Sequence, residues 1–116
     1  MSERPSIGDK RLEYLDLSNK CIAAGDYNQA MVYVENFLAT IREGSDVSKE
    51  IQKAFDTIEI KKNETWLQVI KETEKIDQWQ QTEVRAMNQN NLAAQVIKDK
   101  KDACWEIAMR LGAFND

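Results

Sequence analysis

The chain contains neither glycine nor proline between Gly44 and Gly112. Glycine and proline are the residues that most often end helices and form turns, so this stretch lacks the strongest local signals for a chain reversal. No window of the sequence alternates apolar and polar residues in the way that a half-buried strand requires. The fold is therefore predicted to be all-α, and any interruption of the long stretch must come from polar clusters.

Two polar clusters are the candidate turns in this stretch. They are Lys61-Lys62-Asn63-Glu64 and Asn88-Gln89-Asn90-Asn91. The stretch is longer than an ordinary globular helix, so we expect it to divide at both clusters. The predicted helices lie near residues 46–62, 64–87 and 91–111. One long helix over residues 46–87 stays open as an alternative, because no glycine or proline marks the break.

Glycine also marks the ends of two helices earlier in the chain. Gly25 can end a helix in the left-handed conformation, and Asp26 can cap the next helix. Gly44 is followed by capping residues in the same way. The predicted helices lie near residues 9–24 and 27–43.

These signals together describe one helical domain over residues 1–116. About five helices with short connections are expected to pack as a compact bundle, after a flexible N-terminus at residues 1–8. The apolar fraction, 42%, is sufficient for a packed core. No segment has the pattern of a membrane span or a signal peptide, so we expect a cytoplasmic protein with no membrane contact.

The segment from Ala24 to Tyr33 resembles the inner turn of a tetratricopeptide repeat, in which a Gly-Asp-Tyr turn is followed by a small residue three positions later. The resemblance covers about residues 11–44 and puts Ala30 at that small position. Ser18 departs from it, because the repeat prefers glycine there. The residues that would build the hairpin are Tyr14, Tyr27, Ala30 and Phe37.

The same spacing is similar to the first hairpin of the microtubule-interacting-and-transport domain, a three-helix fold that would extend to about residue 62. Both resemblances imply a protein-binding module. No second copy of the tetratricopeptide pattern follows, and a solenoid groove needs about three stacked repeats. The resemblance therefore implies a helical hairpin without implying a peptide-binding groove.

Histidine is absent from the chain. Its absence excludes Ser-His-Asp and Cys-His catalysis and also excludes zinc or haem held by histidine. Cys21 and Cys104 have no neighbouring cysteine at a metal-binding spacing, so both are expected to be reduced and packed as small apolar side chains. No cofactor and no metal are predicted.

Carboxylate pairs supply an alternative in which the chain is an enzyme. Asp56 and Glu59 lie one helical turn apart, as do Glu74 and Asp77, and two such helices facing each other could hold Mg²⁺. The pattern resembles that of the all-α nucleotide pyrophosphohydrolases, although Asp56 replaces the leading glutamate. Helical phase disfavours this alternative, because Asp56 points away from the apolar stripe of its helix and Glu59 lies about a quarter turn from it.

Basic residues supply a third possibility, a small subunit of a nucleoprotein complex. The net charge is −4, and nucleic-acid-binding domains usually carry a basic stripe. The short basic segments are interleaved with acids and are expected to be solvated helix surface. Direct binding of nucleic acid is therefore disfavoured. The residues that would touch phosphate in this alternative are Lys61, Lys62, Lys98, Lys100 and Lys101.

Aromatic placement supplies the favoured functional prediction. Trp79 lies off the apolar stripe of its predicted helix, and Trp105 and Met109 lie off the stripe of the last one. Exposed tryptophans are frequent at protein interfaces. We expect a non-enzymatic helical protein–protein interaction module, either a homo-oligomer or a small accessory subunit of a larger complex, with these three residues as contacts.

Two charged residues interrupt the apolar stripes. Asp77 lies on the stripe of the predicted helix 64–87, and Lys100 lies mid-stripe in the last helix. Burial of an unpaired carboxylate is costly, so Asp77 either finds a donor or lies at a solvated part of its helix. A pair between Lys100 and Asp77 is one solution.

Overall fold

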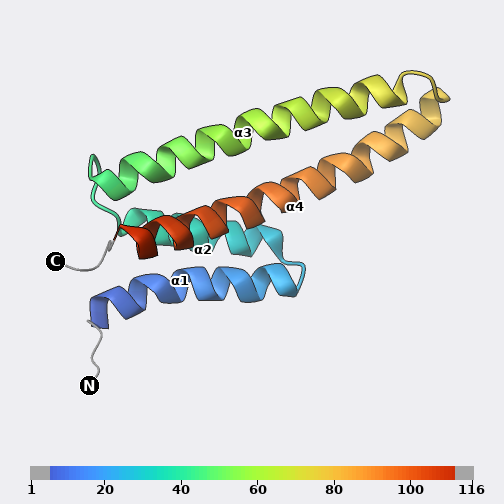
Figure 1. The fold of residues 1–116 in the computed structure, drawn as a ribbon. Coiled ribbons are helices and arrows are strands. Elements are labelled where there is room, and N and C mark those ends of the chain that lie inside the picture. Colours follow the sequence, from blue (N-terminus) through green and yellow to red (C-terminus); the bar gives the residue numbers. More distant parts are fainter. Residues whose placement is uncertain (1–5, 112–116) are drawn as a thin grey trace.

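A computed structural model describes residues 6–111 of the chain, with side chains described from Arg11 onward. All regular structure in this part of the chain is helical, which confirms the all-α class. Its four helices, in chain order, are α1 (Ser6–Ala23), α2 (Tyr27–Ala39), α3 (Asp46–Thr73) and α4 (Gln78–Arg110). They form two antiparallel hairpins, α1–α2 and α3–α4, and α4 also packs against α1 and α2 (Figure 1).

The predicted turns at Gly25 and Gly44 are confirmed. Both glycines have positive φ angles, 81° and 79°, a conformation that disfavours any side chain. The carboxylate of Asp26 accepts a hydrogen bond from the backbone N–H of Gln29 at 3.2 Å, which caps α2. Ser45 caps α3 in the same way.

The helix ends differ from the expected ones by a few residues. α1 begins at Ser6 rather than near residue 9, so the last three residues of the segment predicted to be flexible, residues 1–8, belong to this helix. Residues 1–5 lie outside the described part of the chain. α2 ends at Ala39 rather than near residue 43, and the backbone tightens there: the N–H groups of Thr40 and Ile41 donate to the carbonyls three residues earlier, of Phe37 and Leu38, at 2.9 and 3.0 Å.

The two turns predicted at polar clusters are wrong. α3 runs without a break through residues 61–64, and α4 runs through residues 88–91, so the described chain has four helices rather than about five. Lysine and glutamate are good helix formers, and asparagine is tolerated where the helix is otherwise supported. Asn88 stays helical with its amide donating to the carbonyl of Val84 at 2.8 Å.

The long stretch turns instead at residues 74–77, and side chains of α4 hold that turn. The Arg85 guanidinium donates to Thr73 Oγ1 at 2.7 Å and to the Ile70 carbonyl at 3.3 Å. Gln81 donates its amide to a carbonyl of the turn at 2.9 Å. The last carbonyls of a helix lack partners within it, so these donors stabilise the end of α3.

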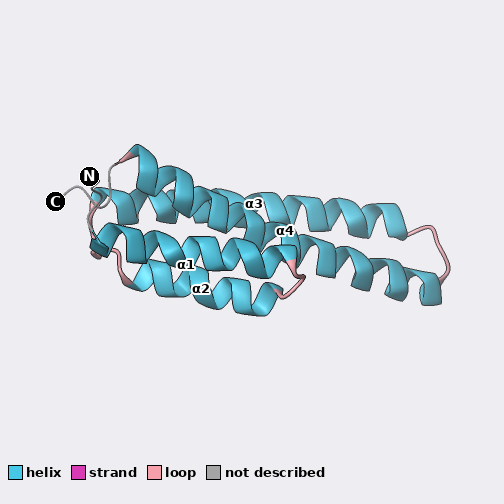
Figure 2. Cartoon of the chain, turned by 90° about the horizontal axis from the view of Figure 1, so that it is seen from below, coloured by secondary structure: helices cyan, strands magenta, loops and turns pink. Residues whose placement is uncertain are grey.

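The sequence predicts a compact bundle, but the molecule is elongated. Its extents are 61 × 28 × 19 Å and its radius of gyration is 17.3 Å, whereas a compact domain of about 100 residues has a radius near 13 Å. Figures 1 and 2 both show the α3–α4 hairpin running well past the α1–α2 turn. We call residues 64–93, the part of α3 and α4 beyond that turn, the arm.

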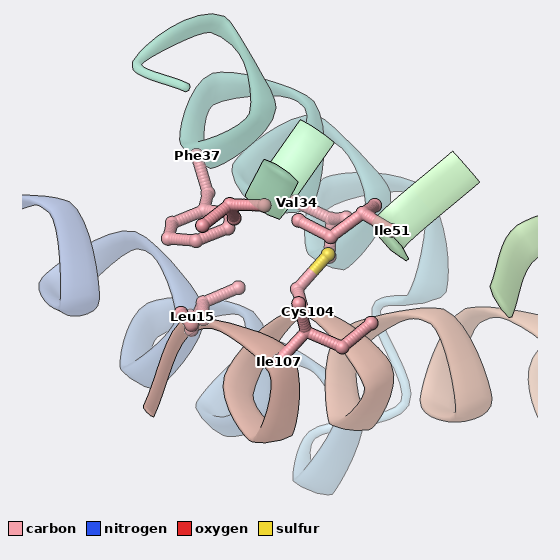
Figure 3. Close-up of a cluster of buried hydrophobic side chains, with 8 residues drawn as sticks. Leu15, Val34, Phe37, Ile51, Cys104 and Ile107 are labelled. Carbon is pink, nitrogen blue, oxygen red and sulfur yellow. The ribbon is translucent and has the colours of Figure 1, made fainter. Parts of the chain in front are cut away.

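The hydrophobic core lies at the other end of the molecule, where all four helices meet. Its fully buried large side chains are Leu15, Val34, Phe37 and Cys104, which come from α1, α2 and α4. The cluster also contains Val47 and Ile51 of α3 and Ile107 and Ala108 of α4, and Figure 3 labels Ile51 and Ile107. Two helices cannot bury a comparable cluster between them, and the arm has only Val69 and Thr73 buried. The arm is therefore the weakly packed part of the fold.

Ser18 joins the two helices of the first hairpin. Its side chain is fully buried, and its hydroxyl donates to the carbonyl of Ala30 at 2.9 Å. Ala30 is also fully buried, so the two backbones approach closely here. The tetratricopeptide pattern prefers glycine at the position of Ser18, and glycine would allow the same close approach.

Replacement of Ser18 by alanine is expected to lower the free energy of unfolding by about 1 kcal/mol, because the buried hydrogen bond is lost. Urea unfolding measured by far-ultraviolet circular dichroism gives the value. Exposed Asn19, replaced by alanine, is the control and should change little. Equal losses in the two variants would contradict the prediction.

Candidate functional site

The four carboxylates of the enzyme alternative do not come together. Asp56 is exposed in the middle of α3, and Glu74 is exposed at the end of that helix, about 27 Å further along at 1.5 Å per residue. Asp77 is the exposed N-cap residue of α4. Within the described residues no cluster of three or more acidic or cysteine side chains could hold a metal ion.

Glu59 lies at the α3–α4 contact, although its predicted position, about a quarter turn from the apolar stripe, does not face the neighbouring helix. Its carboxylate is 3.0 Å from the ammonium of Lys100 and 3.9 Å from that of Lys62. The Lys100 ammonium also lies 5.1 Å from the centre of the Phe55 ring. The hydrogen bond from Lys100 and the charges of both lysines lower the pKa of Glu59 below its ordinary value, against a smaller opposite effect of partial burial.

The suggested pair between Lys100 and Asp77 is wrong. Asp77 starts α4, and Lys100 lies 23 residues further along the chain, about 35 Å by the helical rise. The Lys100 side chain is only 16% exposed, and its partner is Glu59. Asp77 needs no buried donor, because the turn places it in solvent.

The Glu59–Lys100 ion pair predicts a small dependence of stability on pH. Because the pKa of Glu59 is lower in the folded chain, the pair stabilises the fold fully at neutral pH and loses its effect as the pH falls below about 4. Glu59→Gln should lower the free energy of unfolding at pH 7 by less than about 1 kcal/mol, because the carboxylate is partly solvated.

Urea unfolding of the wild type and of Glu59→Gln at pH 7 and at about pH 3.5 measures this difference. Glu64→Gln, at an exposed position of the same helix, is the control. A difference between wild type and Glu59→Gln that grows as the pH falls would contradict the assignment.

The two cysteines are free thiols, and Cys104 is part of the core. Burial raises the pKa of the Cys104 thiol to about 12, with a weaker opposite effect of the nearby Lys100 charge. This thiol is therefore protonated at neutral pH and behaves as a small apolar side chain. Cys21 is half-buried in α1.

The basic residues do not gather into one exposed patch. Lys62 and Lys100 share Glu59, and Lys101 pairs with Asp102 at 2.6 Å. The remaining two candidates, Lys61 and Lys98, are exposed on α3 and α4. This arrangement lacks the basic stripe that contacts a phosphate backbone.

The predicted contact residues lie at opposite ends of α4. Trp79 is 64% exposed on the arm, whereas Trp105, 43% exposed, lies near the core with exposed Met109 one turn further on. The two tryptophans are separated by 26 residues, about 39 Å along the helix. Trp105 lines a cavity of about 280 Å³ between α1 and α4. A small partner therefore cannot contact both tryptophans at once.

The arm has two further exposed apolar residues, Leu67 and Met87, which are not among the contact residues predicted from the sequence. The spacing of apolar residues in the predicted helix 64–87 puts Met87 on the apolar stripe of that helix. The turn at residues 74–77 interrupts that helix. A count of helical positions that continues through the turn therefore assigns Met87 to the wrong face. If helical positions are counted from the start of α4, Met87 falls outside the apolar stripe of that helix.

A second cavity lies where the α1–α2 hairpin ends against α4. Its volume is about 390 Å³, and its walls are residues 25–28, at the turn and the start of α2, and the α4 residues Asn90, Asn91, Ala93, Ala94 and Ile97. Beyond this cavity no part of α1 or α2 covers α4 (Figures 1 and 2). The cavity thus marks the start of the uncovered length of the helix.

No protein-family model, curated protein or solved structure matches this chain. The likeness of residues 11–44 to a tetratricopeptide or microtubule-interacting-and-transport hairpin therefore stays a resemblance. None of the helices within residues 6–111 combines the length and the apolar character needed to cross a lipid bilayer.

Proposed function

We propose that this chain is a non-enzymatic helical protein–protein interaction module that acts through its arm, as a homo-oligomer or as a small subunit of a larger assembly. The observation that carries the proposal is the uncovered length of α4. Its C-terminal half is covered by α1 and α2, whereas among the described helices only α3 lies beside its N-terminal half. A helix packed on one side only leaves a face available to another protein.

The side chains on the arm support this proposal. Leu67, Trp79 and Met87 are each more than half exposed. Tryptophan and methionine are enriched at protein interfaces, and tryptophan frequently supplies much of the binding energy.

We also propose a cytoplasmic location, because both cysteines are free thiols and a reducing compartment maintains them.

Photocrosslinking tests the proposal. A benzophenone amino acid is placed at Met87 on the arm, and in a second variant at Asn36, an exposed position of α2. Irradiation in extracts of the cells that make the protein should give a discrete crosslinked species from position 87 and none from position 36. Mass spectrometry then identifies the crosslinked protein, and Trp79→Ser should abolish the product.

Two results would contradict the proposal. Position 87 and other arm positions could give no product, or positions 87 and 36 could give the same products in similar amounts. The second result would mean that the arm is no more engaged than the rest of the surface.

A further inference from the structure

One face of α4 is buried in the core at one end and uncovered at the other. Trp79, Ala86 and Ala93 are spaced by seven residues and therefore lie on one face of the helix. The same face continues into Ile97 and Cys104. Cys104 is fully buried in the core that α1 and α2 help to form, whereas Trp79, Ala86 and Ala93 are exposed. The uncovered face thus continues a surface that already packs against a helical hairpin.

The two ends of this uncovered face differ, because one carries an exposed tryptophan and the other borders a cavity. Trp79 projects at one end and is 64% exposed. At the other end lies the cavity of about 390 Å³ between Ala93, Ala94 and the α1–α2 turn. A ligand pocket for a small organic group has about this volume or somewhat more, so one indole ring can enter it. One chain cannot place its own Trp79 there, because α4 separates the two by about 21 Å.

We propose that the uncovered face of α4 binds a second copy of this chain, with the two α4 helices antiparallel and Trp79 of each copy seated in the cavity of the other. The inference rests on the proposed function and names the partner for it. The resulting dimer has two-fold symmetry, since each copy contributes the same projecting residue and the same cavity. Each cavity is filled only when the other copy is present.

The spacing of the face places the two-fold axis at Ala86. This residue is seven positions from Trp79 and seven from Ala93, so antiparallel pairing about Ala86 puts each tryptophan opposite the Ala93 of the other copy. Seven residues correspond to about 10.5 Å on each side of the axis. Alanine at the crossing point allows two helix backbones to approach closely, because its side chain is a single methyl group.

The charges on the face fit the same pairing. Between Trp79 and Ala93, the exposed side chains on this face include one charged residue, Glu83. Antiparallel pairing about Ala86 brings Glu83 opposite residues 89 and 90 of the second copy, which carry amide groups that can donate to a carboxylate. The two Glu83 residues stay about 9 Å apart along the axis. The face therefore has no like charges in contact.

The length of the contact sets the expected affinity. The uncovered part of α4 from Gln78 to Ala93 is about 24 Å long. A contact between single helices over this length is at the small end of specific interfaces, so we expect a dissociation constant on the order of micromolar.

Sedimentation equilibrium of the purified chain from about 1 µM to about 200 µM tests the inference. The wild type should convert from monomer to dimer over this range. Trp79→Ala should weaken the dimer at least about 30-fold, because a buried tryptophan at an interface typically acts as a hot spot. Trp105→Ala, at the other exposed tryptophan of α4, is the matched control and should leave the dimer unchanged.

A symmetric disulfide tests the register. In a Cys21→Ser background, Ala86→Cys should form a disulfide-linked dimer under mild oxidation, because only residues at a two-fold axis meet their own copy. Ala93→Cys is the control and should stay reduced, since the two copies of residue 93 are about 21 Å apart along the axis. The remaining Cys104 is buried.

The outcomes separate this inference from the proposed function. A chain that stays monomeric at all concentrations, or a dimer that Trp79→Ala leaves unchanged, would overturn the inference. A dimer linked as readily at residue 93 as at residue 86 would also overturn it. A monomeric chain whose position 87 crosslinks to a different protein would overturn the self-association and retain the proposed function.

Discussion

Replacement of Phe37 by alanine is expected to lower the free energy of unfolding by about 3–5 kcal/mol. The Phe37 ring is fully buried in the cluster that joins α1, α2 and α4 (Figure 3). Removal of the ring loses the transfer free energy of the buried surface and leaves a cavity that close-packed neighbours fill only in part. Since small domains are stable by about 5–15 kcal/mol, this loss is a large fraction of the total.

Urea unfolding followed by circular dichroism measures the effect. Phe37→Leu provides a second variant that keeps most of the volume and should cost less than about 1.5 kcal/mol. Val32→Ala, at an exposed position of the same helix, is the control and should cost little. A loss in Phe37→Ala no larger than that in Val32→Ala would contradict the position of the core.

Replacement of Glu64 by proline is expected to destabilise α3 by about 3 kcal/mol or more. Glu64 is exposed, so no buried contact is lost with its side chain. It lies well inside α3, where proline removes a backbone hydrogen bond and its ring clashes with the preceding turn of the helix. If a helix began at residue 64, the same proline would occupy a favourable first position.

Gln78→Pro is the matched control, because Gln78 is the first residue of α4. The preceding Asp77 has φ −58° and ψ 144°, a conformation that is compatible with a following proline. This variant should be close to neutral in stability. Far-ultraviolet circular dichroism and amide hydrogen exchange in the arm distinguish the two variants. Equal tolerance of both prolines would place a helix boundary near residue 64.

The α1–α2 hairpin was predictable because its signals are local. Gly25 takes a left-handed conformation that few other residues adopt, and Asp26 caps α2 within three residues. Gly44 and Ser45 act in the same way before α3. Each of these signals involves neighbours in the chain, so the sequence alone identifies them.

The exposure of Trp79 was also predicted from its angular position on a helix, although that position was measured on the predicted helix 64–87 and not on α4. The prediction grouped Trp79 with residues before the turn, whereas it belongs to the first turn of α4. Its neighbours on the true face are Ala86 and Ala93 rather than the residues of α3. Sequence periodicity identified an unusual side chain but could not identify the surface around it, because the start of the helix was unknown.

The sequence by itself determined the all-α class, the two glycine turns and the absence of histidine chemistry, since each depends on residue type or on contacts between near neighbours. Only the tertiary structure decided where the long stretch turns and which charge Lys100 pairs with. The turn at residues 74–77 depends on Arg85 and Gln81, which reach it only when α4 folds back along α3. The partner of Lys100 depends on the same packing. Contacts of this kind leave no local pattern in the sequence, because they exist only once the two helices lie side by side.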